Sequence, residues 1–107
     1  MKQNYKRPFA QFVKKAHKPL QLAIADAVEL VCESPDIGEL KVGDLAGIRV
    51  YKFHFNRQEY LMAYRPPIKN LPLDFLICDF YQVGSHENFY ADLKHYLQQE
   101  RGKGESK

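Results

Sequence analysis

Two neighbouring stretches in the middle of the chain alternate between two kinds of side chain, and this alternation most strongly constrains the fold. The stretches are residues 48–56 (IRVYKFHFN) and residues 59–65 (EYLMAYR). Every second position is aromatic or methionine: Tyr51, Phe53 and Phe55 in the first stretch and Tyr60, Met62 and Tyr64 in the second. A period of two is that of a β-strand, whose successive side chains point to opposite faces. The alternation therefore predicts two strands.

The segment between these strands predicts a tight hairpin. A turn of two or four residues near residues 56–58 pairs odd positions of the first strand with even positions of the second. Both aromatic rows then lie on one face, whereas a three-residue turn would separate them. We therefore expect a hairpin with one aromatic core face. Its other face carries three polar and three apolar side chains: Lys52, His54, Arg65, Val50, Leu61 and Ala63.

Two helices are predicted before the hairpin. The first follows from apolar residues at helical spacing, which are Phe9, Phe12, Val13 and Ala16. Pro19 ends that pattern and suits the first turn of a second helix. The second helix covers residues 20–33, which are mostly apolar and are followed by the helix-breaking Ser-Pro-Asp at residues 34–36. The two helices should form a helical hairpin.

The remaining elements complete an α+β fold. Residues 75–83 (FLICDFYQV) are almost uniformly apolar and predict a central third strand. A short final helix is predicted from Phe89, Leu93, Tyr96 and Leu97. Residues 1–6 are a candidate edge strand. The expected architecture is an N-terminal helical hairpin packed on a small antiparallel sheet, with one domain over residues 1–98 and a flexible polar tail over residues 99–107.

Bulk composition excludes several classes of protein. The 107 residues are 45% hydrophobic and 27% charged, which is typical of a globular domain and not of a disordered or membrane protein. The net charge of +3 permits a polyanionic partner. Cys32 and Cys78 are far apart and predict buried thiols in a reducing compartment. With neither a signal peptide nor a membrane span in the sequence, we expect a cytoplasmic location.

The residues that could perform chemistry are isolated cations and imidazoles. Neither metal-ligand spacing nor a phosphate-binding glycine loop is present, so we expect neither a metal nor a cofactor. The polar hairpin face offers Lys52, His54 and Arg65, and the corner before the last helix offers His86 and Tyr90. Metal-free RNA cleavage needs a base for the ribose hydroxyl, an acid for the leaving oxygen and cations for the phosphate. By spacing alone, the same residues are more typical of a solvated sheet face and a packed corner than of an active site.

At these residues the chain resembles the RelE/ParE toxins of bacterial type II toxin–antitoxin systems. The resemblance rests on the helical hairpin, on residues 43–65 (GDLAGIRVYKFHFNRQEYLMAYR) and on residues 83–97 (VGSHENFYADLKHYL). It implies a fold like that of microbial ribonucleases and a cognate antitoxin that neutralises the toxin. RelE-like members cleave mRNA on the ribosome, and ParE-like members inhibit DNA gyrase. The first activity is our expectation, as a metal-independent endoribonuclease, and the second is the alternative, with a member that only binds its antitoxin as a third.

The resemblance also implies roles for individual residues. His86 would be the acid, as in members with a histidine near the start of the last helix, and Tyr90 would stack on a base. Lys52 and Arg65 would stabilise the phosphate, with Arg49 as a further substrate contact. His54 lies where histidine-rich members place a base.

The chain departs from the RelE-like pattern at two places. Leu61 follows the tyrosine of the second hairpin strand, where an arginine is common. The last strand has Phe80, Tyr81 and Gln82 where another arginine is usual. A ParE-like activity needs neither arginine.

Overall fold

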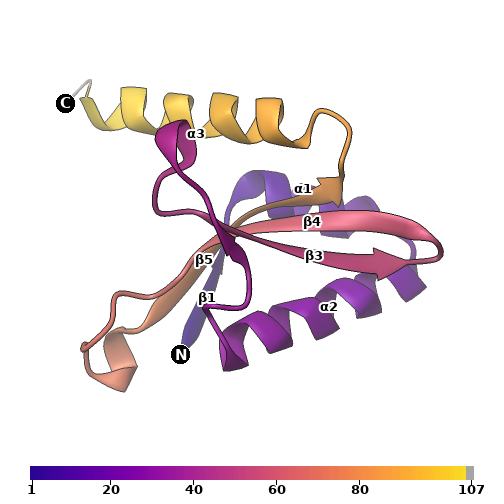
Figure 1. Ribbon diagram of the computed structural model, residues 1–107, viewed down its shortest axis with the longest axis horizontal. Coiled ribbons are helices and arrows are strands. Elements are labelled where there is room, and N and C mark those ends of the chain that lie inside the picture. The colour runs from indigo at the N-terminus through magenta and orange to yellow at the C-terminus, as the bar shows by residue number, and fades with distance from the viewer. Residues whose placement is uncertain (106–107) are drawn as a thin grey trace.

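The computed structural model describes residues 1–105 as a five-stranded sheet with helices on both faces (Figure 1). The strands are β1 (Lys2–Tyr5), β2 (Glu39–Leu40), β3 (Arg49–Phe55), β4 (Gln58–Arg65) and β5 (Ile77–Ser85). The helices are α1 (Arg7–Lys15), α2 (Lys18–Glu33) and α3 (Phe89–Glu105), with short 3₁₀ turns η1 (Gly43–Leu45) and η2 (Leu73–Phe75). The predicted α+β architecture is confirmed.

The sheet has the order β1-β5-β4-β3-β2. All neighbouring strands are antiparallel except β1, which pairs with β5 in parallel. Residues 1–6 therefore do contribute an edge strand, but the sheet is mixed and not wholly antiparallel. Strand β5 has a neighbour on each side, as expected for the apolar third strand, although it starts and ends two residues later than predicted.

The predicted hairpin of β3 and β4 is confirmed in its register. Tyr51 lies opposite Met62 and Phe53 opposite Tyr60, so both aromatic rows share one face. The turn consists of Asn56 and Arg57, whose φ angles are 51° and 66°. Two consecutive left-handed residues form the two-residue turn that matches the natural twist of a hairpin.

Each face of the sheet has its own core. Helices α1 and α2 cover the aromatic face, where Phe9, Ile24 and Val31 pack on side chains such as Tyr64 and Phe80. Helix α3 covers part of the opposite face, where Phe89, Leu93 and Leu97 pack on a second set that includes Val50, Leu61 and Ala63. The polar hairpin face predicted from the sequence is therefore divided, because α3 buries its apolar middle and leaves its ends accessible.

Two elements differ from the expectation. Residues 39–40, for which the sequence pattern predicts no strand, form the short edge strand β2. Residues 99–105, expected to belong to a flexible tail, are the last turns of α3. One contact from these turns reaches the body of the fold, an ion pair of 3.0 Å between Glu100 Oε2 and Lys6 Nζ.

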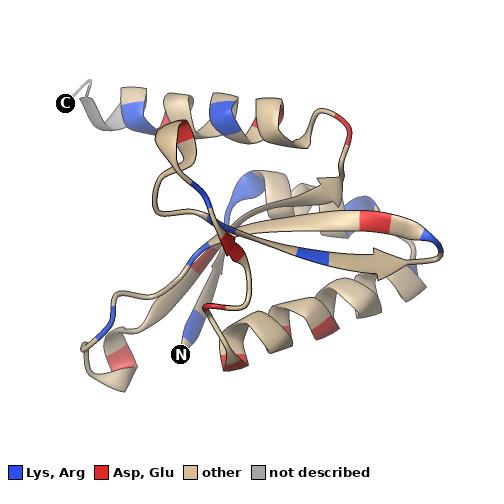
Figure 2. Ribbon diagram, viewed as in Figure 1, with Lys and Arg blue, Asp and Glu red and all other residues tan. Residues whose placement is uncertain are grey.

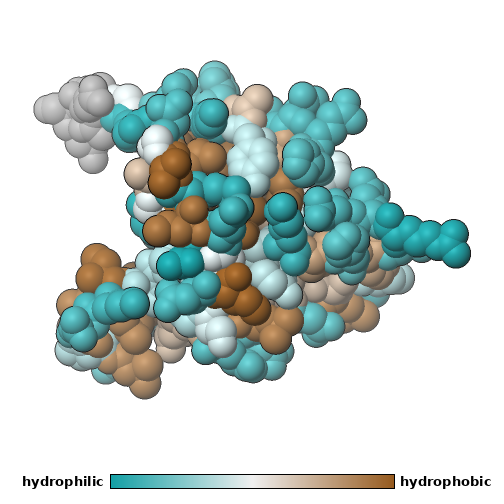
Figure 3. All heavy atoms as spheres, viewed as in Figure 1, coloured by the Kyte–Doolittle hydropathy of each residue, from teal (hydrophilic) through white to brown (hydrophobic). Residues whose placement is uncertain are grey.

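The segment between β4 and β5 projects from the body of the molecule. It exposes large apolar side chains, of which Ile68, Leu73 and Phe75 are the most accessible. Hydrophobic atoms gather at this projection in the space-filling view (Figure 3, lower left). No helix described within residues 1–105 is long and apolar enough to cross a membrane.

Candidate functional site

Lys52 and His54 lie on the exposed end of the hairpin, on the face that α3 covers in part. Both side chains are exposed, and Lys52 lies opposite the buried Leu61. His54 lies opposite Glu59, with 4.0 Å between His54 Nε2 and Glu59 Oε2. The alternation of the strand places both residues on the face predicted from the sequence.

His86 and Tyr90 form the corner between β5 and α3. Asn88, with a φ of 60°, turns the chain and its carbonyl accepts a bond from the backbone N–H of Asp92 in the first turn of α3. The His86 and Tyr90 rings meet edge to face, 6.0 Å apart between centroids. His86 is exposed and does not point into the core, and Tyr90 is half-buried. The imidazole is therefore available to a substrate, which an acid requires.

Lys41, which the sequence did not single out, lies between β2 and this corner. Its Nζ is 5.2 Å from the centroid of the Tyr90 ring and 2.5 Å from Glu39 Oε1. The hydrogen bond to Glu39, with a smaller contribution from the Tyr90 hydroxyl, raises the pKa of Lys41. The same hydrogen bond lowers the pKa of Glu39, and Lys52 adds to that lowering. Lys41 and Glu39 therefore remain charged at neutral pH.

We call these five residues, Glu39, Lys41, Lys52, His86 and Tyr90, the corner cluster. It brings together an exposed imidazole, an aromatic ring and two ammonium groups close to the N-terminal end of α3. Cations and the positive end of a helix dipole favour an anion such as a phosphate. An imidazole can exchange a proton near neutral pH, and a tyrosine ring can stack on a base. The cluster thus has the side chains for binding and cleaving a phosphodiester.

Arg65 does not join the corner cluster. It lies four residues beyond Leu61 along β4, a separation of about 13 Å at the rise of a strand. Its guanidinium stands over the Tyr81 ring at 5.7 Å, and its Nε donates a long bond of 3.4 Å to the Tyr81 hydroxyl. It lines a small pocket with Leu97 and Glu100 of α3. The packing of α3 on Leu61 and Ala63 lies between Arg65 and Lys52.

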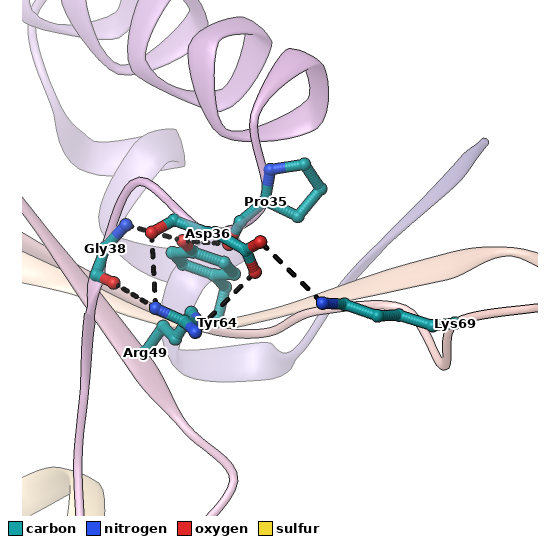
Figure 4. Close-up of polar contacts among 6 residues, drawn as sticks. All are labelled: Pro35, Asp36, Gly38, Arg49, Tyr64 and Lys69. Atoms are coloured by element: carbon teal, nitrogen blue, oxygen red, sulfur yellow. Dashed lines mark hydrogen bonds and ion pairs between the residues drawn. The ribbon is translucent and has the colours of Figure 1, made fainter.

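Arg49 lies on the aromatic side of the sheet, as its odd position indicates, and anchors a loop (Figure 4). Its Nη1 donates to the carbonyl oxygens of Gly38, at 2.7 Å, and Asp36, at 3.2 Å. Its Nη2 is 3.6 Å from the Asp36 carboxylate. The hydroxyl of Tyr64 joins the same group, because it accepts a bond from the Gly38 N–H and donates to the Pro35 carbonyl.

A second concave region adjoins the corner. It is a groove of about 520 Å³ between α1 and α3, with the end of β5 at its floor. Its lining includes Gln11, Lys15, Gln82, Glu87 and Tyr96. Since Glu87 directly follows His86, this α1–α3 groove begins beside the corner cluster. In the described part of the chain no three His, Cys, Asp or Glu side chains are grouped to hold a metal ion.

A helical hairpin on one face of this five-stranded sheet and a third helix on the other are the architecture of RelE/ParE superfamily toxins. A family model for the ParE-like toxin of type II bacterial toxin–antitoxin systems matches residues 4–94, and the chain belongs to this family. No curated protein and no solved structure matches it significantly. The family membership expected from the hairpin and the His86 corner is confirmed.

Proposed function

We propose that this type II toxin stops translation by cutting mRNA on the ribosome, with the corner cluster as its active site. The observation that carries the proposal is the contact of His86 and Lys41 with the same Tyr90 ring, while Lys52 acts on the neighbouring carboxylate of Glu39. An acid, a base-stacking ring and phosphate-binding cations are then close enough to act on one nucleotide.

Each group in the corner has a separate role in this proposal. His86 protonates the departing 5′-oxygen, and Tyr90 stacks on a base beside the cleaved bond. Lys41 and Lys52 stabilise the negative charge of the phosphorane. His54, further out on the hairpin, takes the proton of the 2′-hydroxyl. Arg65 and Arg49 would contact only parts of the RNA away from the cleaved bond. Their guanidinium groups face Tyr81 and the Asp36–Gly38 loop, respectively.

Primer extension on cellular mRNA after induction of the toxin tests this function. Cuts within translated codons are expected for the natural chain. His86→Ala should lower the cleavage rate by about 10² to 10⁴, the usual contribution of a general acid. Lys41→Gln should lower the rate without changing the cut positions, because it removes phosphate stabilisation and leaves the acid in place.

His17→Ala is the matched control, since His17 is an exposed histidine between α1 and α2, beside Phe55, and lies outside both the corner cluster and the α1–α3 groove. It should cleave like the natural chain. Growth arrest by His86→Ala at the natural level, with the same mRNA cuts, would rule out His86 as the acid.

Inhibition of DNA gyrase is the second candidate function. It is favoured by the separation of Arg65 from the corner cluster and by Leu61 standing where nucleases of the superfamily commonly have an arginine. Intact mRNA together with an induced DNA-damage response would support it. Inhibition of supercoiling by purified toxin and gyrase would distinguish it from a general growth defect.

A cognate antitoxin is the partner of a type II toxin. We propose that a segment of the antitoxin lies in the groove between α1 and α2 and continues along the β1 edge of the sheet. The groove has a volume of about 450 Å³ and a mostly apolar lining: Tyr5, Phe9, Ala10, Val13, Lys14, Gln21, Ile24, Ala25 and Val28. An amphipathic segment that is disordered when free gains this apolar contact on binding.

A further inference from the structure

The charges of the chain are distributed unevenly along the sequence. The first 25 residues contain six of the 16 Lys and Arg residues, whereas all 13 Asp and Glu residues lie at position 26 or later. The N-terminal segment therefore carries +6, and the rest, with ten basic and 13 acidic residues, carries −3. The overall charge of +3 is therefore small although the N-terminal segment is strongly basic. Such asymmetry is typical of proteins that bind nucleic acid.

The fold gathers these cations on the outer side of α1 and the start of α2. Arg7 and Lys14 are seven residues apart in α1, which is nearly two turns, so they lie on one line, with Lys15 beside them. Lys18 begins α2 directly after the turn. All four side chains are exposed, and the blue segments of α1 in Figure 2 mark part of this surface. We call these four residues, Arg7, Lys14, Lys15 and Lys18, the basic face.

None of these four cations forms an ion pair with a side chain that the structure describes. Among the side chains described in residues 1–102, Lys6 is the one cation of the N-terminal segment that does, with Glu100. The charges of the basic face are therefore free for a partner.

Helix stability does not explain the placement of these cations. Arg7 and Lys18 are the first residues of their helices, and neither helix has an acidic residue in its first turn. A cation at a helix N-terminus opposes the helix dipole, and each such charge costs about 0.3–1 kcal/mol. Lys14 and Lys15, in the last turn of α1, have favourable positions. Two unfavourable placements in one surface indicate a functional requirement.

The basic face is continuous with the α1–α3 groove and, through it, with the corner cluster. Lys15 belongs to both the basic face and the lining of the groove. Two partly exposed aromatic side chains, Phe12 and Tyr96, and two exposed amides, Gln11 and Gln99, line the same groove, and the carboxylates of Glu87 and Asp92 lie at its α3 side. Aromatic rings flanked by cations suit single-stranded nucleic acid, whose unpaired bases can stack while its phosphates contact Lys and Arg.

We propose that the basic face and the α1–α3 groove bind the phosphodiester backbone of single-stranded RNA on one side of the cleavage site. The identity of the strand rests on the proposed mRNA cleavage, whereas the requirement for a polyanion rests on the charges alone. The groove leads the strand from the corner cluster toward Lys15, and the remaining cations hold the phosphates further along it.

Fluorescence anisotropy with a single-stranded RNA of roughly 20 nucleotides, 2′-O-methylated to prevent cleavage, tests the inference. The triple variant Arg7→Gln/Lys14→Gln/Lys18→Gln removes three of the proposed phosphate contacts. Each contact contributes about 0.7 to the slope of log affinity against log salt, so the slope should fall by about 2. At 0.1 M salt this corresponds to a roughly hundredfold loss of affinity.

A control with the same loss of charge is Lys69→Gln/Lys94→Gln/Arg101→Gln, whose three residues are exposed and lie outside the basic face. It should bind RNA within about threefold of the natural chain, since only long-range charge is lost. Urea unfolding should find the basic-face variant at least as stable as the natural chain, because two helix-dipole conflicts are removed. Weaker binding then cannot be attributed to misfolding.

Three results would overturn the inference. They are unchanged RNA affinity in the basic-face variant, an equal loss in the control, and equal affinity of the natural chain for duplex DNA of the same length. A variant that loses antitoxin affinity but keeps RNA affinity would assign the basic face to an acidic protein segment instead. If the natural chain binds RNA through the basic face and yet cuts no mRNA, the proposed cleavage fails and this inference stands.

Discussion

Tyr64 combines a buried ring in the aromatic core with a hydroxyl that makes two hydrogen bonds. Its ring is fully buried, and its hydroxyl connects the end of α2 to the loop before β2. It accepts from the Gly38 N–H at 2.9 Å and donates to the Pro35 carbonyl at 2.6 Å. A Cβ at Gly38 would stand 2.8 Å from this hydroxyl, so glycine is required there for steric reasons.

Tyr64→Phe should therefore destabilise the protein. The substitution leaves the buried Gly38 N–H without its acceptor, which costs about 1–3 kcal/mol. Urea unfolding followed by circular dichroism measures the loss. Tyr60→Phe is the control, because the Tyr60 hydroxyl makes only a long, exposed contact of 3.4 Å with Gln58. Equal stability of the two variants would mean that the Tyr64 hydrogen bonds contribute nothing net.

The residues of the site were predictable to different extents. His86 and Tyr90 are close in sequence, so a local pattern was enough to pair them. Lys41 was missed because its approach to Tyr90 depends on the path of the loop around β2, which no local periodicity encodes. Strand alternation predicted the correct face of the sheet for Arg65. Alternation does not give the distance along the strand, however, and α3 separates Arg65 from Lys52.

At the scale of elements, the groove between α1 and α2 should determine neutralisation without affecting toxicity. Ala25 is an exposed residue of α2 in the lining of this groove. Ala25→Glu places a carboxylate that an apolar antitoxin segment would have to desolvate, which disfavours binding. The variant toxin should still arrest growth, and co-expressed antitoxin should no longer restore it.

The control variant Gln98→Glu adds the same charge on the exposed surface of α3. Co-expressed antitoxin should still restore growth in cells that make this variant toxin. Full rescue of the Ala25→Glu variant, with unchanged affinity by calorimetry, would place the antitoxin on another surface.

Elements with a long, regular pattern were predictable, and those fixed by distant partners were not. The β3–β4 hairpin followed from its period of two and a short turn. Strand β2 has only two residues, too few for any period, and forms because β3 offers an open edge. The last turns of α3 are polar and contain Gly102 and Gly104, which are weak helix formers, so their helical state could not be read from composition.

At the scale of the whole molecule, burial of a thiol links stability to pH. Cys78 is fully buried, and burial raises its pKa to about 12. In the unfolded chain a cysteine loses its proton near pH 8.5. Above that pH the unfolded state binds fewer protons than the folded state, so the free energy of unfolding falls by up to about 1.4 kcal/mol per pH unit until the folded thiol ionises.

Cys78→Val removes this titration from a core β-strand position that suits valine. The stability difference between the natural chain and the variant, measured by urea unfolding, should shift in favour of the variant between pH 8 and pH 10.5. The tyrosines and lysines titrate in both proteins and cancel in the comparison. A difference independent of pH would show that the thiol ionises equally in the two states.

Sequence patterns alone were enough to predict the order of the main elements, the aromatic face of the hairpin, the family and the pairing of His86 with Tyr90. These depend on periodicity and on residues close in the chain, which local stereochemistry fixes. Three features emerged only from the three-dimensional packing: α3 divides the polar face, Lys41 joins the corner cluster while Arg65 does not, and the basic face adjoins the α1–α3 groove. These depend on how separate elements pack, and the burial of side chains distant in sequence decides that packing.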